Sequence, residues 1–451
     1  MVMQIGDEFS VKIEKLSNLG TGIARVDGQV VFVENACPED DVKIKITKLN
    51  KNYATAKITE MITPSPHRIE AFCPLQKVCG ACQIQFINYD YQLELKRQMV
   101  QDALYSIANI DIAVPLTIPS PKTKEFRHKI QYPVSRTKVS RRLLAGYYKP
   151  QTHEIVNIKY CPIQPRICDE IIEHIRLKSF DYGISGYNEK KHVGDLRHVV
   201  LRSSVATGKV LVTLVANAKK SFDRLEDLAK DIFQSFDEVS GVCVNLNPKN
   251  TNVILSDNTI CVCGDDFVEE KVLDTVFKIG ANTFFQVNPE SAENIFKYVK
   301  NEVKKLEAPT VLDAYAGIAV FGILMSDVAR DVVSVEQNAE SVKKAREVIK
   351  KNGIKNVRVF EDDTAKYLKN LKRKFDVTLL DPPRKGCTKE ALDEVLAHTK
   401  SEIVYVSCNP ATLARDLKYL IEKGCTLKSV QPFDMFCHTF HVETVAFLTV
   451  S

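Results

Sequence analysis

The most constraining feature of this 451-residue sequence is a regular alternation of strand-like and helix-like segments that begins near residue 308. Amphipathic helical patterns fill the first five gaps between short apolar runs, whereas the last two runs are joined without a helix. This alternation predicts a Rossmann-like, doubly wound parallel sheet with an antiparallel last strand and with ligands at the carboxyl ends of the strands. The expected strands are 310–315, 331–336, 357–360, 375–380, 403–407, 427–432 and 444–448.

The sequence before this region predicts two further domains, so that the whole chain is multidomain α/β. Residues 1–62 alternate apolar and polar positions in short bursts separated by turns, which indicates a small OB-like β-barrel. Residues 63–272 mix strand-like runs with helical patterns and predict an α+β middle domain, with a linker helix near 91–108. Residues 273–451 then form the α/β domain.

The linker helix is recognised by one apolar stripe. Lys96 and Arg97 are expected to lie off that stripe, as charged residues usually do. The stripe consists of Leu93, Val100, Ala103, Leu104 and Ile107.

Composition limits the compartment and the kind of cysteine chemistry. The chain shows no signal-peptide pattern and no apolar run near the ~20 residues that cross a bilayer, so we expect a cytoplasmic protein without a membrane partner. Thirteen cysteines in such a chain argue against a disulfide framework and leave metal ligation, catalysis and burial as their uses. The formal charge of +5 allows a polyanionic partner without requiring one.

A nucleoside cofactor site is predicted after the first strand of the α/β domain. Gly317, in the segment Asp313-Ala-Tyr-Ala-Gly317, lets the backbone approach a ligand closely. Glu336, at the end of the second strand, is placed to accept the hydroxyls of a ribose. Gly317 and Gly322 do not give the spacing of a dinucleotide fingerprint, so S-adenosylmethionine fits better than NAD. The alternative is a purely structural turn.

The fourth strand is followed by Asp381-Pro-Pro-Arg-Lys-Gly386, a stiff loop at the same sheet edge. A simple strand-ending turn explains the prolines, but not Asp381 or the Arg384 and Lys385 pair. These two cations stand where phosphates of a polynucleotide would pass.

A candidate nucleophile follows the fifth strand. Cys408, in Ser407-Cys-Asn-Pro410, would lie beside the Asp381 loop, although a cysteine at a strand end is more often a small buried hydrophobe. A thiolate that adds to C6 of uracil makes C5 able to accept a sulfonium methyl group, and a base must then remove the C5 proton. Glu443 is the candidate base, with His438 and His441 as competitors in the same loop.

Cys73, Cys79 and Cys82 form a C-x5-C-x2-C pattern, and Cys161 is a plausible fourth ligand. Four thiolates suit zinc or an iron–sulfur cluster. Zinc sites more often pair two C-x2-C knuckles, so the three-plus-one arrangement favours [4Fe-4S]. We expect this cluster to hold the middle domain together or to position RNA, because methyl transfer moves no electrons.

An RNA partner is indicated by a basic stretch, 122–142, that alternates with aromatic residues. Arg127 and Lys129 are its candidate RNA contacts, and a merely solvated basic face is the alternative. The target uracil would have to leave its stack to meet Cys408, so a looped or locally opened RNA is expected.

Taken together, these motifs resemble those of the RNA (uracil-5-)-methyltransferase family. The resemblance covers essentially the whole chain, because the segment 20–25 looks like part of the RNA-binding TRAM module of that family. The most specific motifs are Ser407-Cys-Asn-Pro-Ala-Thr-Leu-Ala-Arg-Asp-Leu417 and Asp381-Pro-Pro-Arg-Lys-Gly386, with His438-Thr-Phe-His-Val-Glu443. Ala319 departs from the second glycine that the family usually has in the cofactor turn.

The resemblance implies a class I methyltransferase fold with Cys408 as nucleophile and Glu443 as base. It places S-adenosylmethionine against Gln286, Tyr315, Glu336, Asp363 and Asp381, and a base against Phe284. The cysteine cluster resembles that of the ribosomal branch, so a monomeric enzyme that forms 5-methyluridine in 23S rRNA is expected. The alternatives are a tRNA uracil-5 methyltransferase, an RNA cytosine-5 methyltransferase and a non-catalytic RNA-binding iron–sulfur protein.

Overall fold

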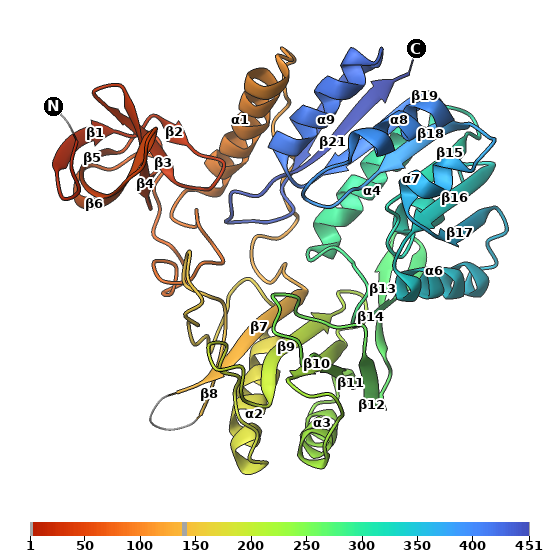
Figure 1. Ribbon diagram of the computed structural model, residues 1–451, viewed down its shortest axis with the longest axis horizontal. Helices are drawn as coiled ribbons and strands as arrows, with labels where there is room; N and C mark the ends of the chain where they lie inside the picture. Colours follow the sequence, from red (N-terminus) through yellow and green to blue (C-terminus); the bar gives the residue numbers. More distant parts are fainter. Residues whose placement is uncertain (1–2, 138–141, 451) are drawn as a thin grey trace. The chain divides into compact units, whose positions relative to one another are not determined.

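The computed structural model describes residues 3–137 and 142–450 (Figure 1). Contacts divide the chain into two compact units. Unit 1 comprises Met1–Ser120, Cys408–Lys418 and Val430–Thr444, and unit 2 comprises Pro121–Ser407, Tyr419–Ser429 and Val445–Ser451. Within the described residues, no helix combines the length and apolar character that a membrane span requires.

The N-terminal part of unit 1 is a curled sheet with the strand order β1-β5-β6-β4-β3-β2. Strand β1 also contacts β3, so the sheet bends round on itself. Apolar residues that alternate along the strands, such as Val31, Val33 and Ile44, fill its interior. The strands are β1 Glu8–Lys12, β2 Lys15–Leu16, β3 Gly22–Val26, β4 Gln29–Glu34, β5 Asp41–Leu49 and β6 Tyr53–Thr63.

Unit 1 also contains the long helix α1, Tyr89–Ala108, which confirms the predicted linker helix. The Asn88 side chain caps its first turn by accepting from the backbone N–H of Tyr91 at 2.9 Å. The expectation that Lys96 lies off the buried stripe is wrong, because Lys96 is completely buried on the same face as Leu93 and Val100. Residues three and four positions apart share one helix face, whatever their polarity.

Unit 2 begins with a six-stranded sheet of order β12-β11-β10-β9-β7-β8. Helix α2 packs on β8 and β9, and α3 packs on β11 and β12. The strands are β7 Lys129–Arg136, β8 Leu143–Ala145, β9 Leu196–Ser203, β10 Val210–Ala216, β11 Val239–Leu246 and β12 Thr259–Gly264, and the helices are α2 Arg166–Asp181 and α3 Asp223–Ser235. A hairpin of β13 Phe267–Val272 and β14 Thr275–Gly280 follows.

The C-terminal half forms a seven-stranded mixed sheet of order β17-β16-β15-β18-β19-β21-β20, which confirms the predicted Rossmann-like fold. The order reverses between β15 and β18, and ligands bind at such a switch point in open α/β sheets. The strands are β15 Thr310–Ala314, β16 Asp331–Glu336, β17 Val357–Glu361, β18 Phe375–Leu380, β19 Thr399–Ser407, β20 Thr426–Phe433 and β21 Glu443–Thr449. The helices are α4 Pro289–Lys304, α5 Val320–Leu324, α6 Ala339–Lys351, α7 Thr364–Lys369, α8 Lys389–His398 and α9 Pro410–Glu422.

Strand direction determines which residues share an edge of this sheet. Strands β15, β16, β17, β18 and β19 are parallel, so their carboxyl ends meet at one edge. The backbone N–H of Val450, just after β21, donates to the carbonyl of Ser401 near the start of β19. Strand β21 therefore runs opposite to β19, and its first residue lies at the edge where β19 ends.

Candidate active site

The loop after β15 is strained where the sequence predicts a cofactor. Tyr315, Gly317 and Ala319 have φ values of 60°, 55° and 55°, in the left-handed region. A Cβ added to Gly317 would meet nothing within 4 Å, so the backbone borders open space there. Strained non-glycine residues cluster at ligand sites, where the surrounding structure holds them in place. Ala319 therefore occupies a conformation that favours glycine.

Asp313, the fourth residue of β15, fixes this loop by hydrogen bonds. Its Oδ2 accepts from the backbone N–H of Gly322 at 2.9 Å and from the Ser334 hydroxyl at 3.0 Å. Burial raises the pKa of the Asp313 carboxyl to about 7, although these hydrogen bonds lower it. The sequence pattern alone predicts no role for Asp313. An acidic residue near the end of a buried strand was the available signal.

Glu336 and Asp381 add two more carboxylates at the carboxyl ends of β16 and β18. Glu336 accepts from the backbone N–H of Gly317 at 2.9 Å and of Asn338 at 2.7 Å, one bond to each oxygen. Each oxygen keeps a second acceptor position for a hydroxyl group. Burial, and then the Asp313 carboxylate, raise the pKa of Asp381 to about 7. The switch point is thus strongly acidic, which suits a ligand that carries positive charge.

The segment before α4 points one aromatic side chain outward and the next one inward. Phe284 is 59% exposed, whereas Phe285 is buried. Gln286 is half-buried. Asn288 caps α4 by accepting from the backbone N–H of Ser291 at 3.2 Å. A capped helix on one side fixes this segment, so that the exposed Phe284 ring is available for stacking.

Asp363, the other predicted cofactor residue, follows β17 and caps α7. Its Oδ1 accepts from the backbone N–H of Lys366 at 3.1 Å, and the residue is exposed. The cap gives Asp363 a local structural role at the carboxyl edge of the sheet.

Cys408 stands between the end of β19 and the start of α9. The Asn409 side chain accepts from the backbone N–H of Ala411 at 3.1 Å, and Pro410 is the first helical residue. Proline at this position and asparagine before it are a strong helix start, which explains why the strand stops there. Cys408 is half-buried and is not in a disulfide. The residue is therefore not fully enclosed, and the adjacent helix N-terminus favours negative charge.

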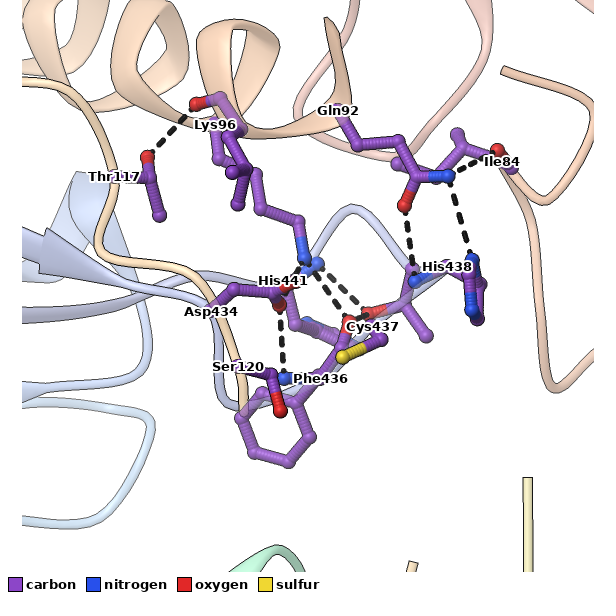
Figure 2. A network of polar contacts seen from close by, with 12 residues as sticks. Ile84, Gln92, Lys96, Thr117, Ser120, Asp434, Phe436, Cys437, His438 and His441 are labelled. Atoms are coloured by element: carbon purple, nitrogen blue, oxygen red, sulfur yellow. Dashed lines mark hydrogen bonds and ion pairs between the residues drawn. The ribbon is translucent and has the colours of Figure 1, made fainter. Parts of the chain in front are cut away.

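Glu443 is the first residue of β21 and is 3% exposed. Because β21 runs opposite to β19, Glu443 and Cys408 lie at the same sheet edge, in unit 1. The competing base His438 is buried and takes part in holding the loop. Its backbone N–H donates to Gln92 Oε1 at 3.1 Å, and its Nδ1 lies 3.3 Å from Gln92 Nε2 (Figure 2). The His441 ring packs against Phe440 with centroids 4.3 Å apart.

A buried ion pair anchors the 434–442 loop, which precedes Glu443, to helix α1 (Figure 2). Lys96 Nζ donates to Asp434 Oδ1 at 2.6 Å and to the carbonyl of Phe436 at 3.0 Å. The Tyr89 hydroxyl donates to the other oxygen of Asp434 at 2.8 Å. Both charged side chains are fully buried. Sequence reasoning missed this pair, because nothing in the spacing of Lys96 and Asp434 signals their contact.

The predicted cluster cysteines lie in both units. Cys73, Cys79 and Cys82 are half-buried in an irregular segment of unit 1, and Cys161 is buried in unit 2. Burial raises the pKa of the Cys79 thiol, a hydrogen bond from the Ala81 backbone lowers it, and the nearby Cys73 raises it further. Across residues 3–137 and 142–450, no three Cys, His, Asp or Glu side chains converge closely enough to hold a metal ion. The cluster stays a prediction.

The predicted basic stretch leads into β7. The Arg127 guanidinium lies over the Tyr147 ring, 5.5 Å from its centroid. Lys129 is the first residue of β7 and pairs with Arg202 of β9. Residues 138–141 of the stretch, including Lys138 and Arg141, lie outside the described residues.

Comparisons with known proteins agree with this architecture. The family model described as tRNA (Uracil-5-)-methyltransferase matches residues 204–451, which is more than half of the chain. The TRAM domain model matches residues 3–59. An uncharacterized RNA methyltransferase of Halalkalibacterium halodurans is 37% identical over 98% of this chain and 97% of its own length. One from Gloeobacter violaceus is 38% identical over 98% and 96%.

A solved structure is similar over the same extent. It is the Pyrococcus abyssi tRNA (uracil-54, C5)-methyltransferase in complex with S-adenosyl-L-homocysteine, with a TM-score of 0.76 and 27% identity, covering 98% of this chain and all of that one. The chain therefore belongs to the tRNA (uracil-5-)-methyltransferase family, and it is an S-adenosylmethionine-dependent RNA (uracil-5-)-methyltransferase with an N-terminal TRAM domain.

Proposed function

We propose that this enzyme forms 5-methyluridine in RNA with Cys408 as nucleophile and Glu443 as base. The observation that carries the proposal is their shared position at one sheet edge, Cys408 directly after β19 and Glu443 at the start of the antiparallel β21. Both are placed by regular structure, which is how a reacting pair is held in a fixed geometry.

The residues that would hold the cofactor are Tyr315, Glu336, Asp381, Gln286 and Asp363. The fit rests on the open backbone at Gly317, on the two free acceptor positions of Glu336, and on the acidity of the switch point. When bound, S-adenosylmethionine supplies an electrophilic methyl group on a positively charged sulfur. Glu336 would accept the ribose hydroxyls, as carboxylates after the second strand of such sheets do.

Cys408 begins the reaction. Its thiolate adds to C6 of the uracil ring, which turns the ring into an enolate and makes C5 nucleophilic. The N-terminal end of α9 stabilises the thiolate that this step needs. Without this addition, C5 of uracil is a poor carbon nucleophile.

Glu443 completes the reaction. Once C5 carries the methyl group, the carboxylate removes the C5 proton, the C5–C6 double bond re-forms and the thiol leaves. His438 is less suited to this task, because Gln92 engages its backbone and its ring.

The experiment is turnover with labelled cofactor, RNA and two variants. Cys408→Ala should form no 5-methyluridine while still binding RNA, and Glu443→Gln should accumulate a covalent RNA adduct. Cys425→Ala removes a buried thiol elsewhere in the chain and should keep wild-type turnover. Retained turnover in Cys408→Ala removes this residue from the mechanism, and failure of Glu443→Gln to accumulate adduct transfers the base role to His441 or His438.

For the substrate we propose 23S rRNA, with four cysteines, Cys73, Cys79, Cys82 and Cys161, holding a [4Fe-4S] cluster. Supporting this, three of these thiols lie in one irregular segment, and Cys73 and Cys79 are close enough to interact electrostatically. Iron and sulfide analysis of protein purified without air tests the cluster. Zinc without iron would contradict it.

The tRNA alternative is favoured by the similarity to the Pyrococcus abyssi enzyme, whose substrate is a tRNA uridine. Mapping 5-methyluridine in rRNA and in tRNA from a strain that lacks the gene decides between the two. Loss of the modified nucleotide from 23S rRNA supports the proposal, and loss from tRNA alone contradicts it.

A further inference from the structure

Two cations face each other in unit 2, and no acidic partner stands beside them in the part of the chain that the structure describes. Lys129 of β7 and Arg202 of β9 are directly paired across adjacent antiparallel strands. Like charges in this position repel each other. Among residues 3–137 and 142–450, neither side chain forms an ion pair with a carboxylate. By contrast, the exposed Lys122 pairs with Glu290 at 3.2 Å.

The surroundings make this arrangement costly for the protein alone. Arg202 is buried, and burial lowers its pKa to about 10. Burial, and then the charges of Arg202 and Arg127, lower the pKa of Lys129 to about 7. A buried arginine whose cross-strand neighbour is a second, half-buried cation is not expected for stability alone.

The same cations border the segment that exposes an aromatic ring. The Arg202 Nη2 donates to the carbonyl of Thr283 at 2.9 Å, next to Phe284. The backbone N–H of His128 donates to the carbonyl of Val287 at 2.7 Å. His128, the residue before β7, and the Arg202 side chain therefore hold the two ends of the 283–287 segment. Cations beside an exposed aromatic ring are what binding of a phosphate and an adjacent base requires.

We propose that Lys129 and Arg202, with Arg127 beside them, form a subsite for one backbone phosphate of the substrate RNA, adjacent to a base that stacks on Phe284. The proposal rests on the proposed function for the identity of the anion. The guanidinium uses one of its five donors on Thr283, which leaves others for phosphate oxygens. An RNA phosphate would compensate the repulsion between the two cations.

The test couples one protein charge to one RNA charge. A series of substrate RNAs carries a single neutral methylphosphonate linkage at each position around the target uridine, and dissociation constants are measured for wild type and Lys129→Gln. One linkage should weaken wild-type binding roughly tenfold, and the same linkage should have almost no effect on Lys129→Gln. Because Lys129→Gln removes one phosphate contact, the plot of log K against log salt should become less steep, its negative slope shrinking in magnitude by about 0.7 to 0.9.

The control is Lys305→Gln, which removes an exposed cation that follows α4 and pairs with Glu302 of that helix, and it should bind every RNA like wild type. If Lys129→Gln does not fold, the wild-type series alone still tests the subsite, because equal binding at all positions would contradict it. A series without any linkage coupled to Lys129 overturns the subsite. If wild type forms no 5-methyluridine in the unmodified RNA, the proposed function fails instead.

Discussion

Lys96 in unit 1 is completely buried and Lys129 in unit 2 is half-buried, and the charged groups around them are opposite. The Lys96 ammonium meets the Asp434 carboxylate and the Phe436 carbonyl. Within residues 3–137 and 142–450, the charged groups that act on the Lys129 ammonium are Arg202 and Arg127. A buried charge whose partners are all present is complete and serves the fold. The half-buried Lys129 has cations beside it that an anionic ligand would compensate, which is why we assign Lys129 and not Lys96 to RNA.

The largest expected effect is a loss of stability when the buried Lys96–Asp434 ion pair is broken. Asp434→Asn leaves the Lys96 ammonium buried without its carboxylate, so the free energy of unfolding should fall by about 3–5 kcal/mol in urea titration. The double variant Lys96→Met with Asp434→Leu replaces both charges by apolar groups and should recover most of this loss. A change below about 1 kcal/mol for Asp434→Asn would show that the pair does not hold the loop.

The carboxylates at the switch point between β15 and β18 also lie close to like charge. Asp381 has no cationic partner among the described residues, and its pKa is raised to about 7 by burial and Asp313. Between pH 6 and 8 this group loses its proton, so affinity for the positively charged S-adenosylmethionine should rise relative to that for uncharged-sulfur S-adenosylhomocysteine. Calorimetry should show a ratio that increases by up to roughly tenfold, equivalent to one pKa unit of coupling. A ratio independent of pH would contradict the role of Asp381.

Removing the charge of Lys129 should stabilise the fold. Lys129→Met relieves the repulsion with Arg202 and should raise the free energy of unfolding by ~1 kcal/mol at pH 7. In wild type the folded state holds fewer protons at Lys129 than the unfolded state between pH 7 and about 10, so its stability rises with pH across this window. The gain from Lys129→Met should therefore shrink between pH 7 and pH 10. A substitution that destabilises at both pH values would contradict the repulsion.

The smallest expected effect is at the strained cofactor turn. Ala319→Gly relieves a left-handed conformation that costs an alanine roughly 1–2 kcal/mol, but it also removes a buried methyl worth ~0.8 kcal/mol. The net gain in stability should be below about 1 kcal/mol by thermal unfolding. A clear loss of stability would show that the turn does not need glycine-like freedom.

Sequence patterns predicted the C-terminal sheet well, because each strand there is a short apolar run followed by a helix with a clear period. They failed at Lys96. A lysine is usually exposed, but its spacing from Leu93 and Val100 places Lys96 on the buried face of α1. They could not find Arg202, since its importance arises only when β9 pairs with β7. The Asn409-Pro410 helix start was readable in sequence, whereas the bonds that fix Asp313 depend on packing of α5 against β15 and β16.

The central claim is a transient bond between the Cys408 sulfur and C6 of uracil, and trapping tests it most directly. In an RNA with 5-fluorouridine at the target position, C5 carries no proton for Glu443 to remove, so the covalent intermediate cannot decay. With cofactor present, peptide mass mapping should find the methylated nucleotide attached to Cys408. Attachment at another residue, or turnover of ordinary RNA without any trapped adduct, would contradict the account.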